Sequence, residues 1–121
     1  MKRILIVEDD TIMRETLRDI LHFEGFHVSS AEGGNDAIGF ISKEVFDLII
    51  TDVLMPERDG FQVIDEAKRR CPDVKIIAIS GGGYVPAQDY LRIATDSGAS
   101  ATLSKPFDVD TLLSTVKNLI K

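Results

Sequence analysis

Residues 46–60 read FDLIITDVLMPERDG, a largely apolar run that reaches Asp52 and is followed by a segment containing proline and glycine. Positions 46–51 are mostly apolar, with Leu48-Ile49-Ile50 at their centre, and such a run is typical of a strand that is buried on both faces of a parallel sheet. Proline has no N–H group for a strand ladder, so residues 54–60 are predicted to form a loop. A carboxylate therefore stands where a central strand is expected to end.

The rest of the chain repeats this alternation of short apolar runs with longer amphipathic ones. Four further strands are predicted, at residues 4–7, 26–31, 74–79 and 101–103. Apolar residues at helical spacing predict five helices, near residues 11–24, 37–41, 61–71, 90–97 and 109–120. This order favours an α/β fold in which five parallel strands form one sheet with five helices on its two faces.

The length of 121 residues is typical of one domain, and no linker or repeat divides the chain. We therefore expect a single domain over residues 1–121. Thr11 is predicted to cap the first helix, and either Asp108 or Asp110 the last one.

The charge balance is acidic, with 14 lysines and arginines against 20 aspartates and glutamates and a net charge of −6. Such a chain lacks the basic surface that displaces counterions from phosphates, so no direct nucleic-acid binding is expected. No apolar run approaches the roughly 20 residues of a membrane span. Cys71 is the single cysteine, which excludes an internal disulfide. We expect a cytoplasmic protein without membrane attachment.

Polar side chains follow four of the predicted strands, and the carboxyl ends of parallel strands share one edge of the sheet, where ligands bind. They are Glu8, Asp9 and Asp10 after the first strand, Asp52 after the third, Ser80 after the fourth and Lys105 after the fifth. Clustered carboxylates repel one another, and Mg²⁺, which prefers oxygen ligands, relieves that repulsion. A lysine and a hydroxyl suit phosphoryl oxygens, and a carboxylate can attack phosphorus to give an acyl phosphate.

Five segments carry a family resemblance by their order and spacing. They are ILIVEDD (residues 4–10), DLIITDVLMP (47–56) with Asp59-Gly60, IIAIS (76–80), Gly98-Ala99 and SKPF (104–107). With them the chain resembles a receiver domain of a two-component response regulator, similar to the single-domain chemotaxis receivers, over essentially its whole length. The resemblance implies a flavodoxin-like, doubly wound receiver fold.

The resemblance also implies roles for the residues at the strand ends. Asp52 would be the phospho-acceptor. Asp9, Asp10 and Asp52, together with the backbone carbonyl of Leu54, would hold Mg²⁺.

Two further residues would act on the phosphoryl group. Ser80 would bind a phosphoryl oxygen, and Lys105 would pair with the phosphoryl group. The peptide bond between Lys105 and Pro106 would be cis, a form that costs little before proline.

The implied function is that of a phospho-accepting regulator. A histidine kinase or phosphotransfer protein would donate the phosphoryl group to Asp52, and phosphorylation would switch binding of a downstream protein to the face of the fourth helix, fifth strand and fifth helix. Beyond its own phosphorylation and slow dephosphorylation, no enzymatic activity is expected. Two alternatives stay open: an interaction module that is not phosphorylated, and a small phosphatase with Asp52 as nucleophile. The chain is either a stand-alone regulator or part of a longer protein.

Two features depart from the usual receiver pattern. Thr102 occupies the position, three residues before the lysine, where receivers usually carry a switching tyrosine or phenylalanine. Three glycines follow Ser80, and without the Gly-x-x-x-x-Gly-Lys pattern they are predicted to form a long loop and not a nucleotide-binding one.

Overall fold

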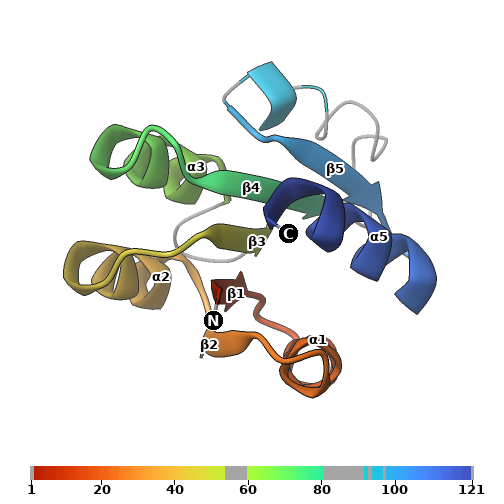
Figure 1. Ribbon diagram of the computed structural model, residues 1–121. Coiled ribbons are helices and arrows are strands. Elements are labelled where there is room, and N and C mark those ends of the chain that lie inside the picture. The colour runs from red at the N-terminus through yellow and green to blue at the C-terminus, as the bar shows by residue number, and fades with distance from the viewer. Residues whose placement is uncertain (1, 54–59, 81–91, 93, 97, 121) are drawn as a thin grey trace.

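The computed structural model describes residues 2–53, 60–80, 92, 94–96 and 98–120. Within them five parallel strands form one sheet in the order β2-β1-β3-β4-β5, which confirms the predicted α/β fold (Figure 1). The strands are β1 (Arg3–Val7), β2 (His27–Ala31), β3 (Leu48–Asp52), β4 (Lys75–Ser80) and β5 (Ala101–Ser104). The helices are α1 (Thr11–Phe23), α2 (Gly34–Lys43), α3 (Gly60–Arg70) and α5 (Val109–Ile120). Of the predicted fourth helix, residues 92 and 94–96 are described and are helical.

The helices cover both faces of the sheet, with α1 and α5 on one side and α2 and α3 on the other (Figure 1). Because side chains alternate along a strand, β1 contributes to both cores. Ile4 and Ile6 pack with the residues of α1 and α5, whereas Leu5 and Val7 pack with those of α2 and α3. This two-sided burial explains why the central strands read as continuous apolar runs.

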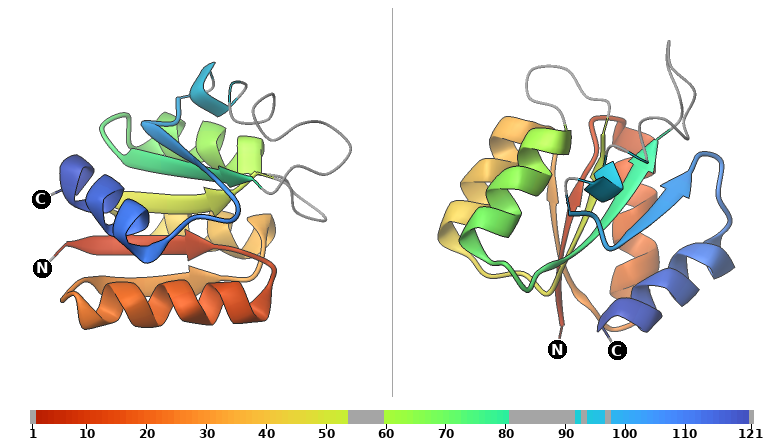
Figure 2. Two further views of the ribbon diagram at one scale, coloured as in Figure 1. Left: turned by 90° about the vertical axis from the view of Figure 1, so that its right-hand side faces the viewer. Right: turned by 90° about the horizontal axis from the view of Figure 1, so that it is seen from above.

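The strand register brings the predicted site residues to one edge. Val7 of β1 pairs with Thr51 of β3, so the residues that follow them, Glu8 and Asp52, lie side by side. The chain enters the sheet at β1, adds β2 on one side and then β3 on the other, so this position is also the switch point where such sheets bind ligands. The two chain ends lie at the opposite end of the sheet (Figure 2).

The helix caps correct one prediction and settle another. Asp10, and not Thr11, caps α1, because its side chain accepts hydrogen bonds from the backbone N–H groups of Ile12 and Met13 in the first turn of the helix. At the start of α5, the N–H of Thr111 donates to Asp108 Oδ1 at 2.7 Å, so Asp108 is the cap and not Asp110. Aspartate is as strong a cap as threonine or stronger, which explains the one-residue shift in α1.

Most element bounds differ from the predicted ones by one or two residues, and α2 begins three residues earlier than predicted, at Gly34. β3 begins at Leu48 and not at Phe46, although the side chain of Phe46 is buried beneath the sheet. In the described part of the chain no helix is long and apolar enough to cross a membrane.

Candidate functional site

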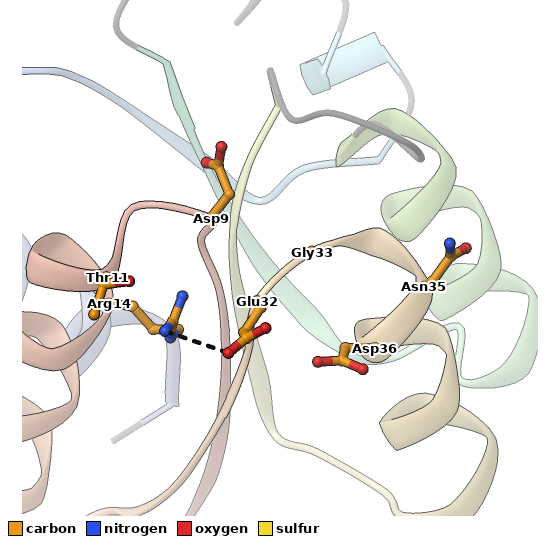
Figure 3. Close-up of a pocket in the computed structure, with 7 residues that line it drawn as sticks. All are labelled: Asp9, Thr11, Arg14, Glu32, Gly33, Asn35 and Asp36. Atoms are coloured by element: carbon orange, nitrogen blue, oxygen red, sulfur yellow. Dashed lines mark ion pairs between the residues drawn. The ribbon is translucent and has the colours of Figure 1, made fainter.

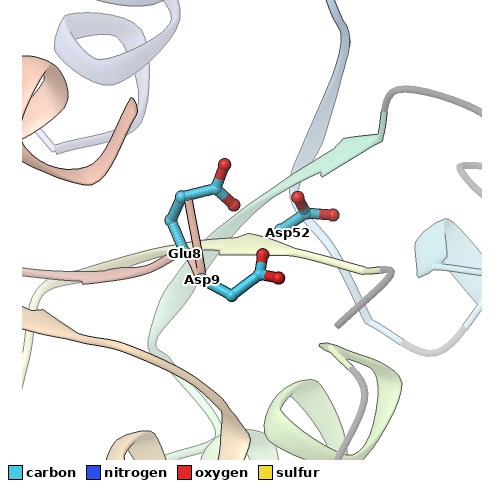
Figure 4. A group of neighbouring side chains, drawn as sticks. All are labelled: Glu8, Asp9 and Asp52. Carbon is cyan, nitrogen blue, oxygen red and sulfur yellow. The ribbon is translucent and has the colours of Figure 1, made fainter. Parts of the chain in front are cut away.

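Three carboxylates meet at the carboxyl edge of the sheet. Oxygen atoms of Glu8, Asp9 and Asp52 all lie within 4.8 Å of one another (Figure 4). The side chains of Glu8 and Asp52 are only 3% and 8% exposed, whereas Asp9 is exposed. The cluster thus has two buried members and one that faces solvent.

Lys105 joins the two buried carboxylates. Its Nζ donates to Glu8 Oε1 at 2.8 Å and to Asp52 Oδ2 at 2.9 Å. The N–H of Lys105 donates to the carbonyl of Ser80 at 2.9 Å, which ties the residue to the end of β4. The Lys105–Pro106 peptide is cis, as predicted.

The electrostatics of the cluster follow from its burial. Burial raises the pKa of Glu8, a hydrogen bond with Asp52 raises it further, and Lys105 only partly opposes them, so the pKa reaches about 7. Burial lowers the pKa of the Lys105 ammonium, but hydrogen bonds to Glu8 and Asp52 outweigh this, and the pKa is raised. The lysine therefore stays charged, while the carboxylates carry more negative charge than one ammonium balances.

Gly60 packs against the backbone of Asp52, a role that was not predicted from the sequence. A Cβ at Gly60 would lie 2.2 Å from the carbonyl oxygen of Asp52 and 2.6 Å from Cα of Val53. The first residue of α3 therefore packs directly on the backbone of the phospho-acceptor candidate. The sequence signal for this close contact is the glycine at the start of a helix, because most other residues have a higher helix propensity.

The structure brings three predicted residues together and places a fourth beside them. Asp9, Asp52 and Lys105 converge, and Ser80 is fully buried at the end of β4, the neighbour of β3. Leu54 lies outside the described residues. Thr102 is half-buried on β5 and pairs with Ala78.

Asp10 is placed elsewhere. Its Oδ1 accepts from the N–H groups of Ile12 at 2.9 Å and Met13 at 3.2 Å, and the residue is exposed. Glu8 is the third carboxylate of the cluster instead. The sequence held a signal for this assignment. Asp10 is the acid directly before the predicted first helix, and aspartate is a preferred cap residue, which leaves Glu8 and Asp9 for the metal site.

The donor set of the cluster fits Mg²⁺. Carboxylate oxygens are the hard ligands that Mg²⁺ prefers, and the excess negative charge of Glu8, Asp9 and Asp52 favours a divalent cation. Exposure of Asp9 leaves room for the waters that Mg²⁺ retains.

Comparison with known proteins gives one consistent family. The family model described as response regulator receiver domain matches residues 4–117. The chain is 37% identical over 123 residues to the response regulator receiver protein CpdR of Brucella abortus, covering 99% of this chain and 98% of that protein. Other relatives are longer, and the chain spans 50% of one and 56% of another.

Solved structures agree with this. A CheY-like response regulator receiver domain protein from Methanospirillum hungatei has a TM-score of 0.90 at 30% identity, covering 98% of this chain and 92% of that one. The response regulator TrrA of Thermotoga maritima, in complex with Mg²⁺-BeF, has a TM-score of 0.86 at 32% identity, covering 98% and 99%. The chain therefore belongs to the response regulator receiver domains of two-component signalling.

Proposed function

We propose that Asp52 accepts a phosphoryl group from a histidine kinase or phosphotransfer protein, and that residues 1–121 act as one receiver domain. The observation that carries this proposal is the contact of Lys105 with both Asp52 and Glu8, beside the exposed carboxylate of Asp9. A carboxylate nucleophile, a cation for the phosphoryl oxygens and a set of metal ligands are the parts that phosphoryl transfer needs.

The transfer is an in-line displacement at phosphorus. A carboxylate oxygen of Asp52 forms the new O–P bond while the P–N bond to the donor imidazole breaks, and its electron pair leaves with the imidazole. Lys105 Nζ, held 2.9 Å from Asp52 Oδ2, places a positive charge beside the transferred oxygens.

Glu8, Asp9 and Asp52 would hold Mg²⁺, with the carbonyl of Leu54 as the further ligand that the family resemblance implies. The bound ion neutralises negative charge on the carboxylates and the phosphoryl oxygens.

Two residues would read the phosphorylated state. Ser80, buried at the end of β4, is proposed to donate its hydroxyl to a phosphoryl oxygen, and Lys105 to exchange its contact with Asp52 for one with the phosphoryl group. Their movement would change the face that β5 and α5 form with the fourth helix, where a downstream protein binds. Val109 of α5 is 47% exposed, which supports a role for this surface in binding.

The test is intact mass after incubation with acetyl phosphate and Mg²⁺. We expect a gain of about 80 Da in the native chain and none in Asp52→Asn. Asp108→Asn is the matched control, because Asp108 is an exposed aspartate that caps α5 far along the chain, and it should gain the same mass as wild type. Absence of a gain in wild type, with Mg²⁺ binding shown separately, would refute phosphorylation and favour an unphosphorylated interaction module.

A further inference from the structure

Arg14 of α1 contacts the backbone of the carboxylate cluster. Its Nη1 donates to the carbonyl oxygen of Glu8 at 3.0 Å, and its Nη2 lies 3.7 Å from Glu32 Oε1. Its side chain is 12% exposed, whereas that of Glu32 is 77% exposed. Figure 3 shows the ion pair of Arg14 and Glu32, and both side chains line a pocket of about 350 Å³ that Asp9 also lines.

The carbonyl of Glu8 belongs to the peptide unit that links Glu8 to Asp9. Because a peptide unit is planar, its orientation sets where both side chains leave the backbone. The N–H of Glu8 donates to the carbonyl of Ala31 at 3.1 Å, which extends the contact of β1 with β2 by one residue. Asp10 is held on the other side by its cap to α1. Arg14 thus holds the peptide between these two anchors.

We propose that Arg14 is a positioning residue for the metal-binding carboxylates, acting through the Glu8 carbonyl. This inference rests on the proposed function. The guanidinium makes the contact with the rigid fork of donors that a lysine lacks. Its low exposure indicates that the contact is shielded from competition by water.

Charge and position predict opposite effects on the cation. Arg14 is itself positive, so by Coulomb's law its removal should tighten Mg²⁺ binding at a site of three carboxylates. Loss of positioning should weaken Mg²⁺ binding, because the backbone that carries the side chains of Glu8 and Asp9 would no longer be held in one orientation. The sign of the change therefore separates the two roles.

The first experiment measures Mg²⁺ affinity by calorimetric titration of the metal-free chain. We expect Arg14→Met to weaken binding by about tenfold, as for other residues that orient metal ligands. Arg14→Lys, which keeps the charge, should recover part of the loss. Glu32→Gln should stay close to wild type, because the contact that matters is the one to the Glu8 carbonyl.

Arg18→Met is the matched control. Arg18 also lies on α1, but its side chain is 48% exposed and pairs with Asp19 at 3.7 Å. It should leave Mg²⁺ affinity within about twofold of wild type. Unchanged or tighter binding in a folded Arg14→Met variant would overturn the proposal, and Arg14→Lys serves the same purpose where the methionine variant fails to fold.

A second readout needs no metal. The backbone amides of Glu8 and Asp9 should exchange with solvent faster in Arg14→Met than in wild type, with no such change in Arg18→Met. Equal exchange in all three proteins would overturn the positioning role. If wild type binds no Mg²⁺ but the amides respond as expected, the proposed metal site fails, while the role of Arg14 in holding the peptide between Glu8 and Asp9 stands.

Discussion

Two charged clusters of this chain use the same kinds of side chain with opposite results. At the edge of the sheet, Glu8, Asp52 and Lys105 meet from distant parts of the chain, and the pKa of Glu8 is raised to about 7, mainly by burial. On α3, Glu66 pairs with two arginines one turn further along, and hydrogen bonds from them lower its pKa to about 2. Both glutamates have cationic partners, so the presence of such a partner does not by itself decide whether the pKa of a glutamate is raised or lowered.

The difference comes from the solvent. Arg69 and Arg70 are 68% and 42% exposed and Glu66 is 20% exposed, so the two guanidiniums on α3 attract the carboxylate while they stay in contact with water. The Glu8 side chain is 3% exposed and shares a single ammonium with Asp52. Folding therefore buries the carboxylates of Glu8 and Asp52 at a cost in free energy, and buried clusters of this kind are typical of functional sites.

The largest expected effect comes from removing the shared ammonium. Lys105→Met leaves the buried carboxylates of Glu8 and Asp52 unbalanced, and we expect the free energy of unfolding of the metal-free protein to fall by about 3 kcal/mol. Urea denaturation measures it. Lys117→Met is the control, because Lys117 pairs with Glu24 at 3.1 Å but is 44% exposed, and it should cost less than about 1 kcal/mol. Equal losses would abolish the contrast between buried and exposed pairs.

The second prediction concerns pH. Because the pKa of Glu8 is about 7 in the folded state and 4.5 ordinarily, the folded protein retains a proton between pH 4.5 and 7 that the unfolded chain releases. The contribution of Glu8 to the free energy of unfolding therefore falls as pH rises through this window. Thermal melts without metal should show a falling Tm that flattens in Glu8→Gln. For Glu66 the sign is reversed: its contribution is present above pH 4.5 and is lost as pH falls toward 2.

The third prediction separates the acids that follow β1. Asp10→Ala should destabilise the protein by about 1 kcal/mol through loss of the α1 cap, whereas Asp10→Asn keeps a capping oxygen and should be nearly neutral. Asp9→Asn should weaken Mg²⁺ binding far more than Asp10→Asn does, as titration would measure. An equal loss in both variants would return Asp10 to the metal site that the sequence predicted.

The smallest loss from removing a charge is expected on α3. Glu66→Gln removes a surface interaction that water screens, so the Tm at neutral pH should change less than in Lys105→Met or Asp10→Ala. Asp52→Asn in the same melts should instead raise the Tm of the metal-free protein, because it relieves repulsion with Glu8. A larger loss from Glu66→Gln than from Lys105→Met would show that burial does not separate the two clusters.

Much of the architecture was predictable because local patterns decide it. The apolar run of β3, ending at Asp52, and the strand–helix alternation follow from side-chain periodicity, which does not depend on distant residues. The candidates Asp52 and Lys105 were predicted because each closes a strand, and parallel strands end at one edge.

The tertiary structure decided which two of three adjacent acids join the cluster. Glu8, Asp9 and Asp10 are chemically alike, so their roles depend on where the extended backbone stops and α1 starts. Pairing of Val7 with Thr51 brings Glu8 to the side of Asp52, and the cap turns Asp10 toward the backbone of α1. The burial that raises the pKa of Glu8 has the same origin, since the packing of several elements around one side chain cannot be read from its neighbours in sequence.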